Sequence, residues 1–115
     1  MSIDHPKLVD FCGINQDEGS CVLVIADDRE WNDWEHLQAL QKKLNNYLAF
    51  IESGEIYTAR PAARGLEIEI AIRCKFVPEG EDDFSALRLA RTAIEDAGFR
   101  FSVVTEMGRF EIPGG

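Results

Sequence analysis

The chain has 115 residues, 45% of them hydrophobic and 29% charged, which is ordinary for a globular protein and enough for one hydrophobic core. Its net charge of -9 opposes a phosphate backbone, so we expect no nucleic-acid partner, and a charged partner should be a basic protein. With no signal-peptide pattern and no apolar run near the ~20 residues of a membrane span, we predict one cytoplasmic domain over residues 1–115, without membrane contact and with flexible tails at 1–6 and 109–115.

The first predicted element is a β-hairpin. Two apolar runs, residues 8–14 and 21–26, flank the turn-rich sequence NQDEGS. The second run is apolar at successive positions, so both of its faces should be covered. We therefore place this strand inside the sheet.

The three cysteines, Cys12, Cys21 and Cys74, all fall in strand-like apolar runs, which favours buried reduced thiols. If QDEG is the loop of the hairpin, Asn15 faces Ser20 and Cys12 faces Leu23. Cys12 and Cys21 then lie on a diagonal at ~7–8 Å, too far for an unstrained disulfide. No C-x-x-C pattern or suitably spaced histidine accompanies them, so the sequence does not predict a zinc site.

A long helix is predicted from about Asp33 to Ser53. Apolar residues recur along it at steps of three and four, at Leu37, Leu40, Leu44, Tyr47 or Leu48, and Ile51. Polar residues, among them Lys43, fall mostly off this stripe. Gly54 is the expected stop, because glycine readily adopts the left-handed conformation that ends a helix.

A second hairpin is predicted from residues 55–60 and 66–76, joined by the turn sequence PAARG. The longer strand alternates cleanly. Leu66, Ile68, Ile70, Ile72, Cys74 and Phe76 should face the core, and Glu67, Glu69, Arg73 and Lys75 should face water.

The remaining predicted elements are a helix from about Phe84 to Ala97, capped by Asp82 or Asp83 and ended by Gly98, and a last strand at residues 99–107. The acidic run EGEDDF (79–84) before this helix is typical of helix capping beside a solvated loop. It would add to an acidic surface if the fold brings it near residues 27–35.

The predicted order is ββαββαβ. Hairpins beside helices, rather than strictly alternating strands and helices, favour helices packed on one face of a sheet. We therefore predict an α+β two-layer sandwich with an antiparallel or mixed sheet of about five strands and both helices on one face.

The stretch DDREWNDWEH (27–36) concentrates acidic, aromatic and histidine side chains where the long helix should begin. The preferred interpretation is structural: Asn32 and Glu35 form a capping box, or Asp27 or Asp28 caps an earlier start. Tryptophans three residues apart should share a face that closes the core, and His36 should be partly buried beside the apolar stripe. The candidate interaction patch comprises Asp27, Asp28, Glu30, Trp31, Asp33, Trp34 and His36.

The alternative is a small enzyme or metal-dependent protein that uses the acidic and histidine cluster at residues 27–36. Asp33 and His36 are three apart and could approach one cation, but a catalytic metal needs a third protein ligand, which the sequence does not nominate. Nucleophile-elbow and phosphate-loop motifs are also lacking. We therefore assign no catalytic residue, metal ligand or cofactor and leave open whether the protein is an enzyme.

The sequence HLQALQKKLNNYLAFIESGEI (36–56), with Trp31 ahead of it, VLVIADD before it and CKFVP after it, resembles a family of small bacterial proteins catalogued only as a domain of unknown function. The resemblance spans about residues 8–99. It implies a bacterial cytoplasmic single domain and one continuous helix that leaves through Gly54 into a strand, and it brings no catalytic residue, cofactor or substrate. Four other features favour a non-catalytic acidic protein-interaction module: the missing catalytic constellation, a strand apolar on both faces, a tryptophan pair near a helix end, and concentrated acidic residues. We expect this module to self-associate as a homo-oligomer, namely a dimer, or to bind a basic protein.

Overall fold

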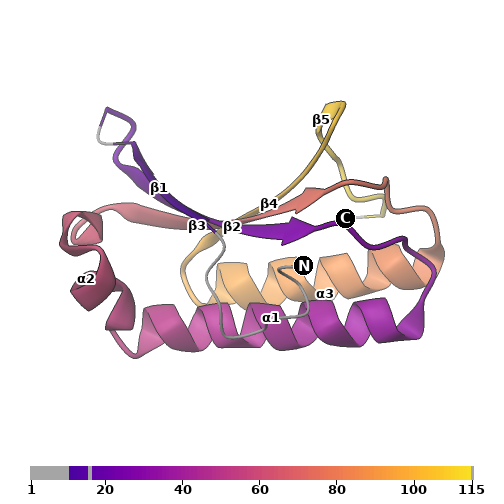
Figure 1. Ribbon diagram of the computed structural model, residues 1–115, viewed down its shortest axis with the longest axis horizontal. Coiled ribbons are helices and arrows are strands. Elements are labelled where there is room, and N and C mark those ends of the chain that lie inside the picture. Colours follow the sequence, from indigo (N-terminus) through magenta and orange to yellow (C-terminus); the bar gives the residue numbers. More distant parts are fainter. Residues whose placement is uncertain (1–10, 16, 115) are drawn as a thin grey trace.

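The computed structural model describes residues 11–15 and 17–114, which form a mixed sheet carrying two long helices on one face (Figure 1). The sheet has five strands in spatial order β1-β2-β3-β4-β5: Phe11–Asn15, Ser20–Asp27, Glu67–Cys74, Arg100–Thr105 and Gly108–Arg109. The long helices are α1 (Trp34–Glu52) and α3 (Glu81–Asp96), and a short α2 (Glu55–Ala59) precedes a 3-10 turn, η2 (Pro61–Ala63). The predicted α+β class, with both long helices on one face of the sheet, is confirmed.

The first hairpin has the predicted register. β1 and β2 are antiparallel, with Asn15 opposite Ser20 and Cys12 opposite Leu23. β2 also pairs with β3, so its predicted place inside the sheet is confirmed. Residues 8–10 of the predicted first strand lie outside the described residues.

The predicted second hairpin is wrong, because residues 55–59 form α2 and β3 pairs parallel to β2. Parallel neighbours need a long crossover connection, and α1, α2 and η2 together provide it. After α1 the chain returns to the start of β2, where the Glu67 N–H donates to the Gly19 carbonyl at 2.8 Å. Ile56 and Ala63 are fully buried on this return, so the segment is held by packing into the core.

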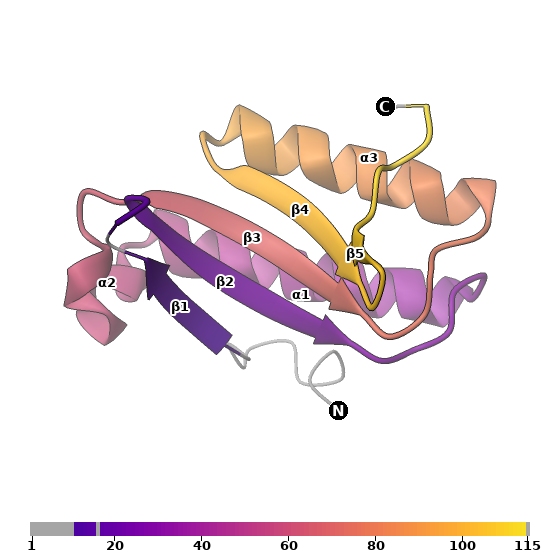
Figure 2. The same ribbon diagram turned by 90° about the horizontal axis from the view of Figure 1, so that it is seen from above.

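A second crossover, through α3, places β4 parallel to β3. Seen from above, α1 passes beneath β2 and β3, and α3 lies on the β4 side (Figure 2). The predicted alternation of β3 holds, since Ile68, Ile70, Ile72 and Cys74 are buried toward the helices. Phe76, predicted to continue this row, lies beyond the end of β3 and is exposed.

The ends of the helices follow local chemistry. Asp33 caps α1 and Ser53 ends it, close to the predicted limits, and Gly54 adopts the left-handed φ of 85° that stops the helix. α3 begins earlier than predicted, with Gly80 as its N-cap residue instead of Asp82 or Asp83. The reason is that the Asp83 carboxylate reaches back to the Gly80 N–H, at 3.1 Å.

The predicted last strand divides into β4 and the short antiparallel β5. Beyond β5 the Phe110 N–H donates to the Val103 carbonyl at 2.8 Å, and the Phe110 ring stacks on Phe84 of α3 with centroids 6.2 Å apart. The Arg88 guanidinium donates to the Pro113 carbonyl. These contacts place residues 110–113 against α3, whereas the predicted tail at 1–6 lies outside the described residues. Within the described chain, no helix has the length and apolar character that crossing a membrane requires.

Candidate functional site

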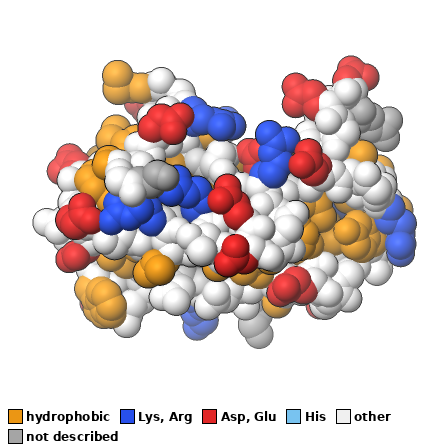
Figure 3. Space-filling model, turned by 180° about the vertical axis from the view of Figure 1, so that it is seen from behind, with side chains coloured by type: hydrophobic (Ala, Val, Ile, Leu, Met, Phe, Trp, Pro, Cys, Tyr) orange, Lys and Arg blue, Asp and Glu red, His pale blue; other side chains and the backbone are white. Residues whose placement is uncertain are grey.

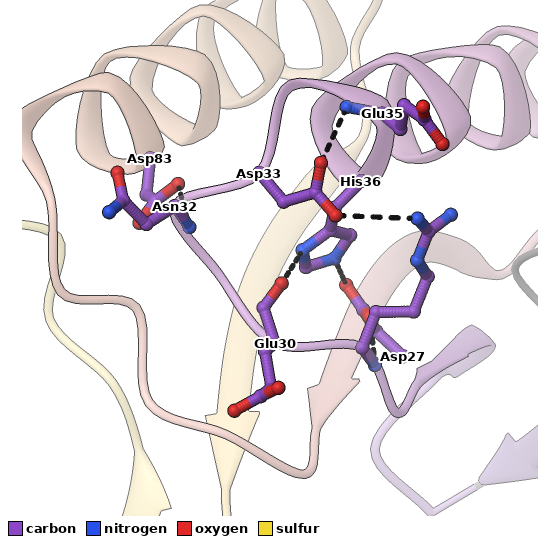
Figure 4. Close-up of polar contacts among 8 residues, drawn as sticks. Asp27, Glu30, Asn32, Asp33, Glu35, His36 and Asp83 are labelled. Atoms are coloured by element: carbon purple, nitrogen blue, oxygen red, sulfur yellow. Dashed lines mark hydrogen bonds and ion pairs between the residues drawn. The ribbon is translucent and has the colours of Figure 1, made fainter.

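The stretch from Asp27 to His36 leads from the end of β2 to the first turn of α1 (Figure 4). The structure divides the predicted patch by environment rather than gathering it on one surface. Asp27, Trp31 and His36 are buried, Asp28, Glu30 and Asp33 lie toward solvent, and Trp34 is 70% exposed on α1.

His36 is fully buried and both of its ring nitrogens are hydrogen-bonded. Its Nδ1 lies 2.9 Å from the Glu30 carbonyl oxygen, and its Nε2 lies 2.6 Å from Oδ2 of Asp27 (Figure 4). A carbonyl oxygen can only accept, so Nδ1 donates to it. The short Nε2–Oδ2 contact then requires a second proton, held between the imidazole and the carboxylate.

Neighbouring groups fix this pair in place. The other Asp27 oxygen accepts from the Arg29 N–H at 3.1 Å, which turns the chain as it leaves β2. The Trp31 ring covers His36 at a centroid distance of 4.3 Å, and its Nε1–H donates to the Phe76 carbonyl at 2.8 Å. The predicted role of Trp31 in closing the core is confirmed.

This geometry suits a structural junction better than a proton-transfer site. A general base or metal ligand needs a nitrogen that faces its substrate or ion, and in His36 the protein occupies both nitrogens. Cys74 lies opposite Asp27 across β2 and β3, where desolvation, and secondarily the charge of Asp27, raise the pKa of its thiol to about 12. Among the described residues, no group of three or more His, Cys, Asp or Glu side chains is arranged to hold a metal ion.

The Asp33 carboxylate caps α1 instead of meeting His36. It accepts from the Glu35 N–H at 3.0 Å and forms an ion pair with Arg29 at 3.6 Å (Figure 4). The predicted capping box with Asn32 as the cap is therefore wrong, as is capping by Asp27 or Asp28. Asn32 instead adopts a left-handed φ of 65°, which asparagine tolerates better than most residues.

Asp83, which the sequence predicted only as a possible helix cap, connects the starts of the two long helices. Its side chain is fully buried and accepts from two backbone groups, the Gly80 N–H at 3.1 Å and the Asn32 N–H at 3.2 Å. It thereby ties the first turn of α3 to the segment that leads into α1. The acidic run 79–84 does approach residues 27–35, and the contact between them is made by this buried carboxylate.

The solvent-facing members of the predicted patch border a shallow polar hollow. Asp28, Glu30 and Asp33 line it together with Arg29 and Lys75. Because cationic and anionic groups alternate there, the hollow has mixed charge. It is not the concentrated acidic surface that the sequence suggested.

Trp34 points to a different part of the surface, so the expectation that both tryptophans close the core is wrong. It lies at one end of a groove of about 500 Å³ between α1 and α3. Buried Leu40, Leu44 and Ile94 contribute to the lining, and Leu89, 72% exposed, also borders the groove. Among the described residues of this lining, Asp82 is the one that carries a charge. Figure 3 shows hydrophobic side chains reaching the surface along the lower edge of the molecule, on the helical layer.

Two polar residues of α1, His36 and Lys43, are buried, and one of them has a signal in the sequence. His36 stands four residues before Leu40, so it extends the apolar stripe back by one turn onto the buried face. Lys43, predicted to lie off the stripe, is fully buried, with its Nζ 5.7 Å from the centre of the Tyr47 ring. Its burial is not evident from residue type, since lysine is rarely fully buried.

Comparison with known proteins gives one match. A sequence model of DUF6572, described as a family of unknown function, matches residues 1–107. No curated protein and no solved structure matches the chain significantly. The predicted resemblance to a family of unknown function is thus confirmed, and the match includes the groove-lining parts of both long helices.

Proposed function

The chain belongs to this family of unknown function, and we propose that it is a non-catalytic protein-interaction module whose docking surface is the groove between α1 and α3. The observation that carries the proposal is the exposure of two large apolar side chains, Trp34 at 70% and Leu89 at 72%, on the border of one apolar groove. Exposed apolar surface of this kind is typical of binding sites, and tryptophan is enriched among residues that dominate binding energy.

The charge of the molecule has a separate role from the groove. A net charge of -9 keeps the protein soluble and steers basic partners toward it at long range. The part of the groove formed by described residues has one charged side chain, Asp82, so the contact made there is mainly apolar. We therefore assign the predicted self-association to this groove and not to the acidic residues.

Site-specific photo-cross-linking in cells that produce the protein tests the proposal. A photoreactive amino acid at Gln41, which lines the groove and is exposed, should yield a covalent protein adduct on irradiation. The matched control carries the same group at Arg73, exposed on β3, and should yield none. Adding Leu89→Asp should remove the Gln41 adduct, because a carboxylate placed against an apolar partner must be desolvated. Adducts of equal yield from both positions, or none from Gln41, would overturn the proposal.

A further inference from the structure

We infer that the occupant of the groove is a second copy of this chain, packed about a two-fold axis so that Trp34 of each copy enters the far end of the other copy's groove. This inference rests on the proposed function of the groove as a docking surface. It adds the identity of the partner and the orientation in which the partner binds.

The spacing of residues along α1 supports a two-fold arrangement. Trp34, Gln41 and Leu48 all line the groove and follow one another at steps of seven residues. At 1.5 Å per residue, Gln41 lies about 10 Å from each of the other two along the helix axis. A two-fold axis beside Gln41, perpendicular to α1, therefore places the Trp34 end of one copy against the Leu48 end of the other.

The two ends of the groove differ in shape in the way this arrangement needs. Trp34 protrudes at the first end. The other end is lined by the smaller side chains of Asn45 and Ala93, with Leu48 half-buried beside them. The Trp34 indole of one copy can pack on the smaller side chains at the far end of the other copy's groove only when the two copies are antiparallel.

Charge also selects a second copy over a basic partner at this surface. A basic partner would need carboxylates to pair with its cations, and the described lining of the groove supplies one, that of Asp82. A second copy presents the same almost uncharged lining. The carboxylates at the helix ends, such as Glu35 and Glu52, are exposed and stay in water.

The available area is sufficient for a dimer of moderate affinity. α1 has 19 residues and is therefore about 28 Å long. α3 has 16 residues and is about 24 Å long, so with ~10 Å of width for each helix the two give a face of ~520 Å² in projection. Accessible area exceeds projected area, so this face approaches the ~800 Å² that a standard interface buries on each partner.

Sedimentation equilibrium on the full chain tests the inference. We expect a monomer–dimer equilibrium between about 1 and 100 μM, within the range that interfaces of this size reach. Trp34→Ala should weaken the dimer by ~30-fold, as for a residue that anchors an interface. The control is Met107→Ala, which removes another exposed apolar side chain, 90% accessible and away from the groove, and should leave the equilibrium unchanged. Because Trp34 is largely exposed, its variant should remain folded by circular dichroism.

Salt dependence separates a second copy from a basic partner. Two copies of charge -9 repel one another, so raising salt from about 50 to 500 mM should strengthen the dimer by screening that repulsion. Salt weakens the binding of a basic partner. A dimer that dissociates on addition of salt would contradict the inferred interface.

Disulfide trapping tests the orientation. Gln38 and Asn45 line the groove on either side of Gln41, so in an antiparallel dimer Gln38 of one copy faces Asn45 of the other. Mixed Gln38→Cys and Asn45→Cys chains should cross-link more than either variant alone, and Lys42→Cys, exposed but outside the groove lining, should not cross-link.

The outcomes distinguish this inference from the proposed function. A chain that stays monomeric at 100 μM while the Gln41 photo-cross-linker captures a different protein overturns the second copy as occupant and leaves the docking surface intact. A monomer with no adduct overturns both. A dimer that is insensitive to Trp34→Ala, or that cross-links Gln38→Cys chains to themselves, overturns the arrangement inferred here.

Discussion

At the scale of single residues, the Asp27–His36 contact is a polar pair that depends on its buried surroundings. Both side chains are almost completely buried, and the atoms that join them lie 2.6 Å apart. A buried polar pair of this kind adds little when intact, because desolvation offsets much of the attraction. Removal of one partner leaves a buried polar atom of the other, Oδ2 of Asp27 or Nε2 of His36, without its hydrogen bond, which costs far more.

We therefore expect His36→Ala to lower the free energy of unfolding by about 3 kcal/mol, since Asp27 would keep its burial and lose its partner. Urea denaturation measures this difference. Glu35→Ala, one residue earlier and exposed, is the control and should change stability by less than ~0.5 kcal/mol. Equal losses for the two variants would show that the Asp27–His36 contact contributes no more to the free energy of unfolding than an exposed side chain does.

Cys74 makes a chemical prediction at the same scale. Burial and the nearby Asp27 raise the pKa of its thiol from 9.0 to about 12, so the folded protein favours the neutral thiol. The resulting stabilisation is fully present below pH 9.0 and is lost as the pH rises from there toward about 12. Native protein at pH 8 should leave Cys74 unmodified by iodoacetamide, and urea-unfolded protein should modify it. Rapid native labelling of Cys74 would contradict its burial.

The thermodynamic counterpart uses Cys74→Val, which keeps an apolar side chain and removes the titrating group. Between about pH 9 and 10.5, the wild-type chain should lose stability relative to this variant, because the unfolded wild-type chain gains a thiolate at position 74 that the variant lacks. Parallel urea denaturation curves at each pH measure the difference. A constant difference across this range would exclude a raised thiol pKa in the folded state.

At the scale of elements, the sequence predicted α1 well and residues 55–60 poorly. α1 has nineteen residues with a continuous apolar stripe, a capping aspartate and a glycine stop, so local and global preferences agree. The sequence EIYTA is only five residues long, and its β-branched and aromatic side chains favour a strand. It forms α2 because Ile56 must reach the core while the chain returns to β3. That requirement comes from the parallel pairing of β2 and β3, which no local pattern encodes.

Parts of the candidate site were predictable for the same reason. The burial of Trp31 and the acidic start of α1 follow from local patterns, and His36 continues the apolar stripe. The Asp27–His36 contact depends on how β2 meets α1, and the Asn32–Asp83 contact joins residues 51 positions apart. The exposure of Trp34 depends on the position of α3, so tertiary packing alone reveals it.

Asp83 ties the first turn of α3 to the segment that leads into α1, so its removal should affect the start of both helices. Asp83→Asn keeps the size of the side chain and replaces one accepting oxygen with a donor, so one of the two backbone N–H groups loses its partner. We expect a loss of about 2 kcal/mol in urea denaturation. Asp82→Asn, exposed on the same turn, should be nearly neutral. A neutral Asp83→Asn would mean that this carboxylate does not fix the helix pair.

At the scale of the whole molecule, the two long helices cover one side of the sheet (Figure 1). The same helices also border an apolar groove. α1 therefore contributes to two surfaces, the core through Leu40 and Tyr47 and the groove through Trp34 and Gln41.

Exposed groove residues should matter for association and not for folding. Leu89→Ser should change the free energy of unfolding by less than ~0.5 kcal/mol at concentrations where the chain is monomeric, as expected for a surface position. A loss near 2 kcal/mol would place Leu89 in the core.

The most direct test of docking through the α1/α3 groove by a second copy is a dilution series of ¹H–¹⁵N correlation spectra. If a second copy docks there, dilution should shift the signals of the Trp34 indole N–H and of amides in residues 34–48 and 82–94, with little change in β1, β3 and β5. Shifts that centre on the strands, or spectra that do not change with concentration, would contradict docking by a second copy.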